Sequence, residues 1–214
     1  MTSQNYTLNV IKNEWVSLDE TFFRHATNGE PALQETQVGL MFDNNYFHIR
    51  FKAFQNPFLH QNTYQNHNEP LYNQEVFEVF IAPNDETPEN YCEIEINPNN
   101  KLWIGKIYNP IKDMGGNTIS AMIDYEQSGI KHSVETAKDM WEGSLSIPYN
   151  LIGKASVYRL NFYRIVAICS HSEPNWECTA ETCNFLCWSP TMSGSQPAFH
   201  RPQYFGKVQI NQSL

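Results

Sequence analysis

The chain has 214 residues, of which 41% are hydrophobic and 14% aromatic, so it can bury a core and is unlike a disordered protein. Its 14 basic and 23 acidic residues give a net charge of −9, and no lysine or arginine cluster is present, which argues against a nucleic-acid partner. No apolar run reaches the ~20 residues of a membrane-spanning helix, so we expect no membrane partner, and the oligomeric state is left open.

The N-terminal residues MTSQNYTLNV contain neither a basic stretch nor an apolar run, so no signal peptide is visible. A chain trimmed to a mature start would read the same way, and the localisation is therefore only weakly bounded.

The first clear strands begin at Thr36. The runs TQVGLMF and YFHIRFKAF alternate apolar and polar residues on either side of Asp43-Asn44-Asn45, which indicates a hairpin. The Asn/Gln-rich residues 55–75 show no periodicity and are predicted to form a long loop, which in a compact domain is usually functional or disordered.

A second hairpin organises the chain, with strands over 76–82 and 91–97 joined by a polar loop. Because side chains alternate between the two faces of a strand, each strand has one apolar face and one face with carboxylates. If Ala82 pairs with Tyr91, Glu78 stands directly opposite Glu95. Opposed like charges are destabilising, so a cation, an arginine or a polar ligand should compensate them. Tyr72 and Trp103 flank this patch, and carboxylates bracketed by aromatic rings suggest a sugar-binding surface.

Further strands follow within 119–148, and VYRLNFYRIVAI is predicted to be one long central strand. In that strand Arg164 shares the apolar face unless a bulge redirects it. We count nine or ten strands and no long helix, which predicts an all-β fold, a single antiparallel β-sandwich spanning 1–214 as one domain. The predicted core residues are Phe77, Val79, Ile81, Ile94, Ile96, Leu160 and Phe162.

Five cysteines are present, and their odd number favours buried or free thiols over a full disulfide framework. Cys178, Cys183 and Cys187 lie close together in the sequence, but their spacing is not that of a common zinc site. A disulfide within this cluster is the better interpretation if the protein is exported.

Taken together and in order, the segments VFEVFIAP, YCEIEINPNNKLW, WEGSLSIPYNLIG, YRLNFYRI, WSPT and FHRPQYFGKVQI resemble the family 9 carbohydrate-binding modules (CBM9) from about Trp15 to Ile210. The resemblance implies a β-sandwich of the jelly-roll or immunoglobulin-like kind, related to DOMON domains. It also implies binding of saccharides, often at chain ends, between two aromatic residues. It suggests an extracellular or periplasmic location if the start is trimmed, and a cytoplasmic one otherwise.

Carried over by position, the resemblance makes Tyr72 one stacking aromatic, Trp188 the other, and Glu78 the acid of the binding strand. Tyr stands at 72 where the family has Trp, and the next strand offers acids where sugar-binding members can have a base. The candidate carbohydrate-binding residues are Tyr72, Glu78, Glu95, Asn97, Trp103, Arg164 and Trp188. No catalytic residue, metal ligand or cofactor is assigned, although calcium is left open without a site.

Several alternatives remain open at this point. Trp103 and Trp188 could be core residues, with Glu78 and Glu95 on a solvated face where Arg159 is the counter-ion. Two carboxylates about 5–5.5 Å apart would also suit a retaining glycoside hydrolase, although binding without catalysis is the favoured function. A DOMON-like haem or redox module is a third class, and it would need axial ligands such as Met192 and His200.

Overall fold

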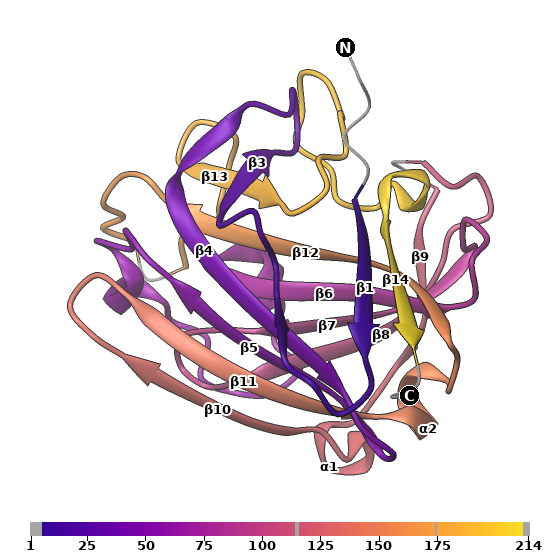
Figure 1. The fold of residues 1–214 in the computed structure, drawn as a ribbon. Helices are drawn as coiled ribbons and strands as arrows, with labels where there is room; N and C mark the ends of the chain where they lie inside the picture. Colours follow the sequence, from indigo (N-terminus) through magenta and orange to yellow (C-terminus); the bar gives the residue numbers. More distant parts are fainter. Residues whose placement is uncertain (1–5, 114–115, 174, 212–214) are drawn as a thin grey trace.

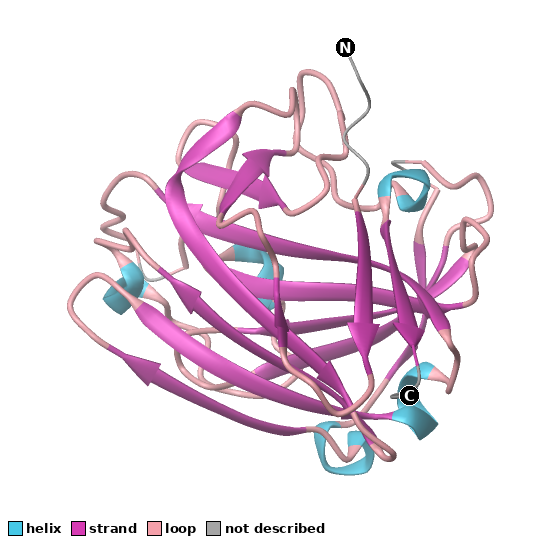
Figure 2. Ribbon diagram, in the orientation of Figure 1, coloured by secondary structure: helices cyan, strands magenta, loops and turns pink. Residues whose placement is uncertain are grey.

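The protein folds into two β-sheets packed face to face in a computed structural model that describes residues 6–113, 116–173 and 175–211 (Figure 1). The front sheet has the strand order β10-β11-β5-β4, with β2 beside β4. The back sheet has the order β3-β13-β12-β6-β7-β8-β9, with β14 beside β12 and β1 beside β14. Short helical turns lie in the connections between strands (Figure 2). The elements are β1 (Thr7–Ile11), β2 (Val16–Ser17), β3 (Phe22–His25), β4 (Pro31–Phe42), β5 (Tyr46–Ala53), η1 (Leu59–Gln61), η2 (Leu71–Asn73), β6 (Val76–Pro83), β7 (Asn90–Ile96), β8 (Leu102–Tyr108), β9 (Thr118–Met122), α1 (Tyr125–Ser128), β10 (Lys131–Thr136), β11 (Trp141–Pro148), α2 (Tyr149–Ile152), β12 (Val157–Ala167), β13 (Cys183–Cys187), η3 (Pro202–Tyr204) and β14 (Gly206–Asn211).

The pairing confirms the predicted all-β sandwich. Strand pairs are antiparallel, apart from the parallel pair β1–β14. Strand β4 joins the sheets, because its first part pairs with β3 in the back sheet and its second part with β5 in the front sheet. The described residues form fourteen strands rather than nine or ten. The additional strands include β2 and β3, which have two and four residues and are too short for a periodic pattern.

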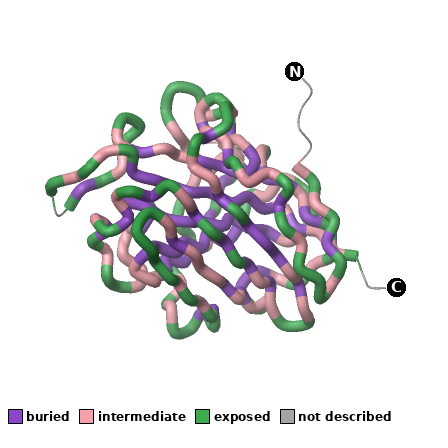
Figure 3. Tube along the Cα trace, turned by 60° about the vertical axis from the view of Figure 1, so that its left-hand side comes forward, coloured by how far each residue is buried: buried purple, intermediate pink, exposed green. Residues whose placement is uncertain are grey.

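The hydrophobic core lies between the two sheets. All seven predicted core residues are buried in it, and the rings of Phe77 in the back sheet and Phe51 in the front sheet stack with centroids 4.0 Å apart. The buried residues follow the strands through the middle of the molecule, and the exposed ones gather at the turns (Figure 3). Alternating sequence patterns therefore predicted the inner faces of these strands correctly.

The outer face of the back sheet is buried as well, which the sequence pattern did not predict. A second apolar cluster there includes Phe80, Tyr91, Trp103 and Tyr163, and residues such as Leu71, Trp176 and Phe199 from three connections pack over it. Glu78 and Glu95 are 1% and 0% exposed on this face, so the alternative of a solvated acidic face is wrong.

Cys178 and Cys183 are joined by a disulfide, whereas the neighbouring Cys187 is a buried free thiol. This is one of the pairings that the cysteine cluster allowed. In the described parts of the chain, no helix has the length and apolar character that crossing a membrane requires.

Candidate functional site

A cavity of about 440 Å³ opens on the outer face of the back sheet. Strands β6, β7 and β8 contribute Glu78, Glu93 and Trp103 to its lining, and the connection between β13 and η3 contributes Phe199 and His200. No lysine or arginine belongs to the described residues that line it. The cavity therefore has carboxylates on its sheet side, with aromatic and aliphatic side chains around them.

Three carboxylates cluster here, of which Glu78 and Glu93 line the cavity and Glu95 is buried beside them; we call Glu78, Glu93 and Glu95 the glutamate triad. The predicted register is confirmed, since Glu78 pairs directly with Glu95 across β6 and β7. Glu93 lies two residues before Glu95 on the same strand and so faces the same side of the sheet. One oxygen from each carboxylate lies within 4.8 Å of the others. Oε1 of Glu78 and both carboxylate oxygens of Glu95 have no hydrogen-bond partner of good geometry in the described structure.

Burial raises the pKa of all three glutamates well above the ordinary value. The carboxylates of Glu78 and Glu93 raise the pKa of Glu95 further, and the backbone N–H of Tyr72 opposes this only in part. A buried negative charge without a partner is costly, so the empty triad holds protons at pH values where exposed glutamates have lost them.

His200 is the nearest basic side chain to the triad. Its Nδ1 lies 2.8 Å from the Tyr91 hydroxyl, and its Nε2 lies 3.9 Å from Glu93 Oε2. Burial lowers the pKa of His200 to about 4, so the ring is neutral at neutral pH. His200 therefore does not supply the positive charge that the triad lacks.

Tyr72 and Trp103 lie beside the glutamate triad and line the cavity, so the two rings flank this patch in space as well as in the sequence. Their rings meet edge to face with centroids 5.8 Å apart, and Trp103 pairs with Glu95 across β7 and β8. Tyr72 is 41% exposed, whereas Trp103 is buried. Burial and the nearby carboxylates of Glu95 and Glu93 raise the pKa of the Tyr72 hydroxyl, which fits its place beside the triad.

The disulfide loop helps to hold Tyr72. The N–H of Cys178 donates to Asn73 O at 2.7 Å, and the Gln74 amide donates to Trp176 O at 3.0 Å. These hydrogen bonds fix the turn η2, which carries Tyr72, against the 168–183 connection.

The position predicted for Trp188 is wrong. Its side chain packs in the core between the sheets, with its ring centroid 6.1 Å from that of Phe162 and 5.6 Å from that of Tyr6. A Cβ atom at Gly206 would stand only 2.3 Å from the Trp188 ring, so the glycine leaves the space that this ring fills. Trp188 and Tyr72 therefore lie on opposite faces of the back sheet.

Arg164 also lies on the inner face of the sheet, away from the triad. Its terminal nitrogens donate to Glu35 O at 2.8 Å, Thr36 Oγ1 at 2.9 Å, Phe54 O at 2.5 Å and the Asn56 side chain. Placing Arg164 in a sugar site is therefore wrong, because its guanidinium links the middle of β4 to the segment that follows β5 instead.

Two other polar residues have structural partners. Asn97 faces the triad side, but its amide donates to Tyr64 O at 3.1 Å and its oxygen accepts from Lys101 N at 2.9 Å. It thus holds the long 55–75 connection in place. Arg159 donates to Phe205 O at 2.6 Å, so the alternative in which it neutralises Glu78 and Glu95 is wrong.

Sequence reasoning missed Glu93 and Phe199 as site residues and considered His200 only as a haem ligand. Glu93 could have been found, since it alternates in phase with Glu95. Phe199 and His200 carried no local signal, because they reach the sheet from more than 100 residues further along the chain.

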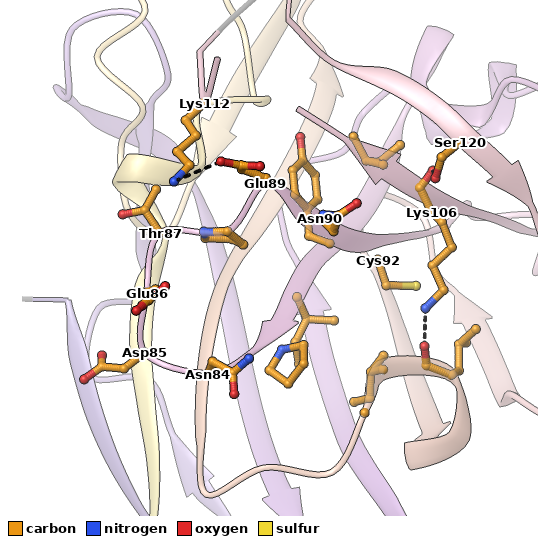
Figure 4. Close-up of a pocket in the computed structure, with 18 residues that line it drawn as sticks. Asn84, Asp85, Glu86, Thr87, Glu89, Asn90, Cys92, Lys106, Lys112 and Ser120 are labelled. Atoms are coloured by element: carbon orange, nitrogen blue, oxygen red, sulfur yellow. Dashed lines mark hydrogen bonds and ion pairs between the residues drawn. The ribbon is translucent and has the colours of Figure 1, made fainter. Parts of the chain in front are cut away.

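A larger hollow of about 1060 Å³ lies at the turn between β6 and β7 (Figure 4). Lys112 and Glu89 form an ion pair of 3.6 Å there, and Lys106 donates to Leu151 O. The polar side chains drawn at this hollow thus include bonded pairs, and no group of unpartnered buried charges is found among its described residues. The glutamate triad is accordingly the stronger candidate site.

Chemically, the site offers hydrogen-bond acceptors at its base and ring surfaces on its walls. Carboxylates accept hydrogen bonds from hydroxyl and amino groups, and aromatic faces pack against C–H surfaces and attract cations. Such a cavity suits a small polar ligand with an apolar face.

Comparison with known proteins places the chain in a family. Residues 41–210 match the model of carbohydrate-binding family 9, a later start than the Trp15 expected from the resemblance. An extracellular protein of Arthroderma benhamiae is 27% identical over 144 residues, which cover 62% of this chain. The match spans 64% of the length of that curated relative.

Solved structures share the fold. A Bacteroides uniformis protein to which carbohydrate binding has been ascribed superposes with a TM-score of 0.67 at 16% identity, covering 96% of this chain and 99% of the other. A family 9 module of Caldicellulosiruptor kristjanssonii solved with glucose gives a TM-score of 0.58 at 13% identity, covering 97% of both chains. Its complex with cellotriose gives 0.53 at 14% identity, covering 97% of this chain and 95% of that one. By its sequence match over residues 41–210, the chain belongs to carbohydrate-binding family 9.

Proposed function

We propose that this carbohydrate-binding domain holds its saccharide in the cavity at the glutamate triad. The ring of Tyr72 packs against the C–H face of a sugar, and the carboxylates of Glu78 and Glu93 accept hydrogen bonds from its polar groups. The ring of Trp103 packs edge to face against that of Tyr72.

The buried, unpartnered Glu78 at the base of the cavity carries the proposal. Burying a carboxylate oxygen without a hydrogen bond costs free energy, so such groups are rare in native proteins and often have a functional role. A ligand hydroxyl or amino group would satisfy it. The related modules solved with glucose and cellotriose support a saccharide as this ligand.

Calorimetry with glucose and cellotriose on the wild type, Tyr72→Ala and Glu78→Gln tests the proposal. Loss of ring packing at Tyr72 should weaken binding by about 0.5–1.5 kcal/mol. Loss of a charge-assisted hydrogen bond at Glu78 should cost about 1.5–3 kcal/mol. If glucose binds too weakly to titrate, cellotriose supplies the comparison.

Trp15→Ala is the matched control, because Trp15 is 42% exposed, as Tyr72 is at 41%, but lies over Arg50 on the front sheet. The control should bind saccharide as the wild type does. If Trp15→Ala abolishes binding while Tyr72→Ala and Glu78→Gln leave it intact, the saccharide binds at the front sheet and the proposal is wrong.

A further inference from the structure

The charge of the glutamate triad bears on which saccharide the site takes, a question that rests on the proposed function above. Three buried carboxylates lie close together, and no described lysine or arginine lines the cavity that Glu78 and Glu93 reach. Arg164 and Arg159 are bonded elsewhere. The nearest base, His200, is held in its neutral form at neutral pH by burial. The described residues around the triad therefore supply no positive charge that would keep its carboxyls ionised.

We propose that the preferred ligand is an amino sugar, whose protonated amine enters the glutamate triad. A primary ammonium has three N–H donors and no acceptor, and the triad presents one oxygen from each of three carboxylates. Donors and acceptors therefore match in number and in sign.

The geometry fits as well. The three oxygens lie within 4.8 Å of one another. Three atoms separated by at most this distance can all lie about 2.8 Å from one nitrogen, the length of a charge-assisted N–H···O bond. Oε1 of Glu78 and both oxygens of Glu95 have no hydrogen-bond partner of good geometry within the described structure, and the contacts of Glu95 with Glu93 and with the Tyr72 N–H lie outside that geometry, so acceptors are available for these bonds.

The surrounding rings favour an ammonium over a bare metal ion. Calcium takes six to eight oxygen ligands, whereas the walls beyond the triad are largely rings and aliphatic groups such as Phe80, Trp103 and Phe199. An ammonium needs only three acceptors, and the aromatic faces attract the remaining positive charge. The net charge of −9 also draws a cationic saccharide toward the protein.

The test compares ligands that differ only at one position of the sugar. Binding of a fully deacetylated glucosamine trisaccharide, its N-acetylated twin and cellotriose is measured by calorimetry at pH 6, where the amine is protonated. We expect the amine to bind at least tenfold more tightly than cellotriose, a difference of about 1.4 kcal/mol or more. In Glu95→Gln and Glu93→Gln this ratio should fall toward one, while the exposed Glu135→Gln leaves it unchanged.

A second readout is the proton balance, measured in two buffers of different ionisation enthalpy. Binding of the amine should release protons, because it ionises carboxyls that are protonated in the empty site. The other titratable groups near the triad are Tyr72 on η2, Tyr91 on β7, Tyr163 on β12, Cys187 on β13 and His200. Burial raises the pKa of these tyrosines and of the Cys187 thiol and lowers that of His200, so none of the five is a source of protons at pH 6. Cellotriose should release none.

The outcomes separate this inference from the proposed function. If cellotriose binds as tightly as the amine, the inference is wrong and the proposed function stands. If no saccharide binds, both are wrong. If calcium chloride raises the Tm of the wild type, leaves Glu95→Gln unaffected and blocks the amine, the triad is a metal site and the inference is overturned.

Discussion

Both faces of the back sheet bury charged groups, but the two groups differ in how many hydrogen-bond partners the fold gives them. On the inner face, the guanidinium of Arg164 is fully buried, and its two terminal nitrogens donate to four acceptors on β4 and after β5, while its Nε alone has no partner in the described structure. On the outer face, Glu78 and Glu95 are as deeply buried and retain oxygens without partners. The two groups lie on opposite faces of the same sheet.

The difference distinguishes a structural charge from a binding charge. A buried charge that donates to several groups of the fold stabilises it, because removing the charge leaves those groups unsatisfied. A buried charge without partners destabilises the fold, and a ligand can satisfy it. Arg164 and the triad glutamates are all buried, so burial does not distinguish their roles. The number of hydrogen-bond partners does.

The largest expected effect is on the inner face. Arg164→Met should lower the free energy of unfolding by about 3–5 kcal/mol, because two backbone carbonyls and the side chains of Thr36 and Asn56 lose a charged donor. Urea unfolding followed by tryptophan fluorescence measures it. Arg50→Met is the control, since the exposed Arg50 stacks on Trp15 at 4.4 Å and should cost below about 1 kcal/mol. Equal losses in the two variants would contradict the structural role of Arg164.

On the outer face the sign should reverse. Glu95→Gln removes a buried, unpartnered charge and should raise the free energy of unfolding at pH 8 by about 1–3 kcal/mol. Because the folded pKa of each triad glutamate is raised, the stability it contributes is complete below its ordinary value of 4.5 and is lost as the pH rises through the raised value.

His200 acts in the opposite direction, and its pH range separates the two effects. Its pKa falls from 6.5 to about 4 in the fold, so its contribution is present above pH 6.5 and is lost as the pH falls toward 4. Between pH 6.5 and 8.5 His200 should no longer change the stability, whereas the triad should, as should Glu75, whose pKa burial also raises; the Glu95→Gln variant isolates the part due to the triad. Thermal unfolding in this range should show the wild type losing stability with rising pH and Glu95→Gln losing less; parallel curves would show that Glu95 is not coupled to folding.

The smallest expected effect concerns Trp188, on the inner face. Trp188→Phe should destabilise the fold by about 1–2 kcal/mol through lost packing against Phe162 and Tyr6. Saccharide affinity should not change, whereas Tyr72→Ala should weaken binding with little effect on stability. Calorimetry and urea unfolding on both variants make the comparison, and a loss of affinity in Trp188→Phe would put the ligand in contact with the inner face.

The sequence by itself determined the strands, their alternation and the register that sets Glu78 opposite Glu95. These features are local, because the two-residue period of a strand assigns each side chain to one of two faces. It also placed Arg164 on the apolar face, and its ordered motifs indicated family 9. The sequence pattern could not show what covers the polar face.

Only the tertiary structure decided that connections remote in sequence bury the glutamate triad. The 188–205 connection packs over β6 and β7 and brings His200 into contact with Tyr91, which lies 109 residues earlier in the sequence. The same packing sends Trp188 inward and gives Arg164 its partners on β4 and after β5. Which buried charges are satisfied depends on contacts between distant segments, and no local pattern encodes these contacts.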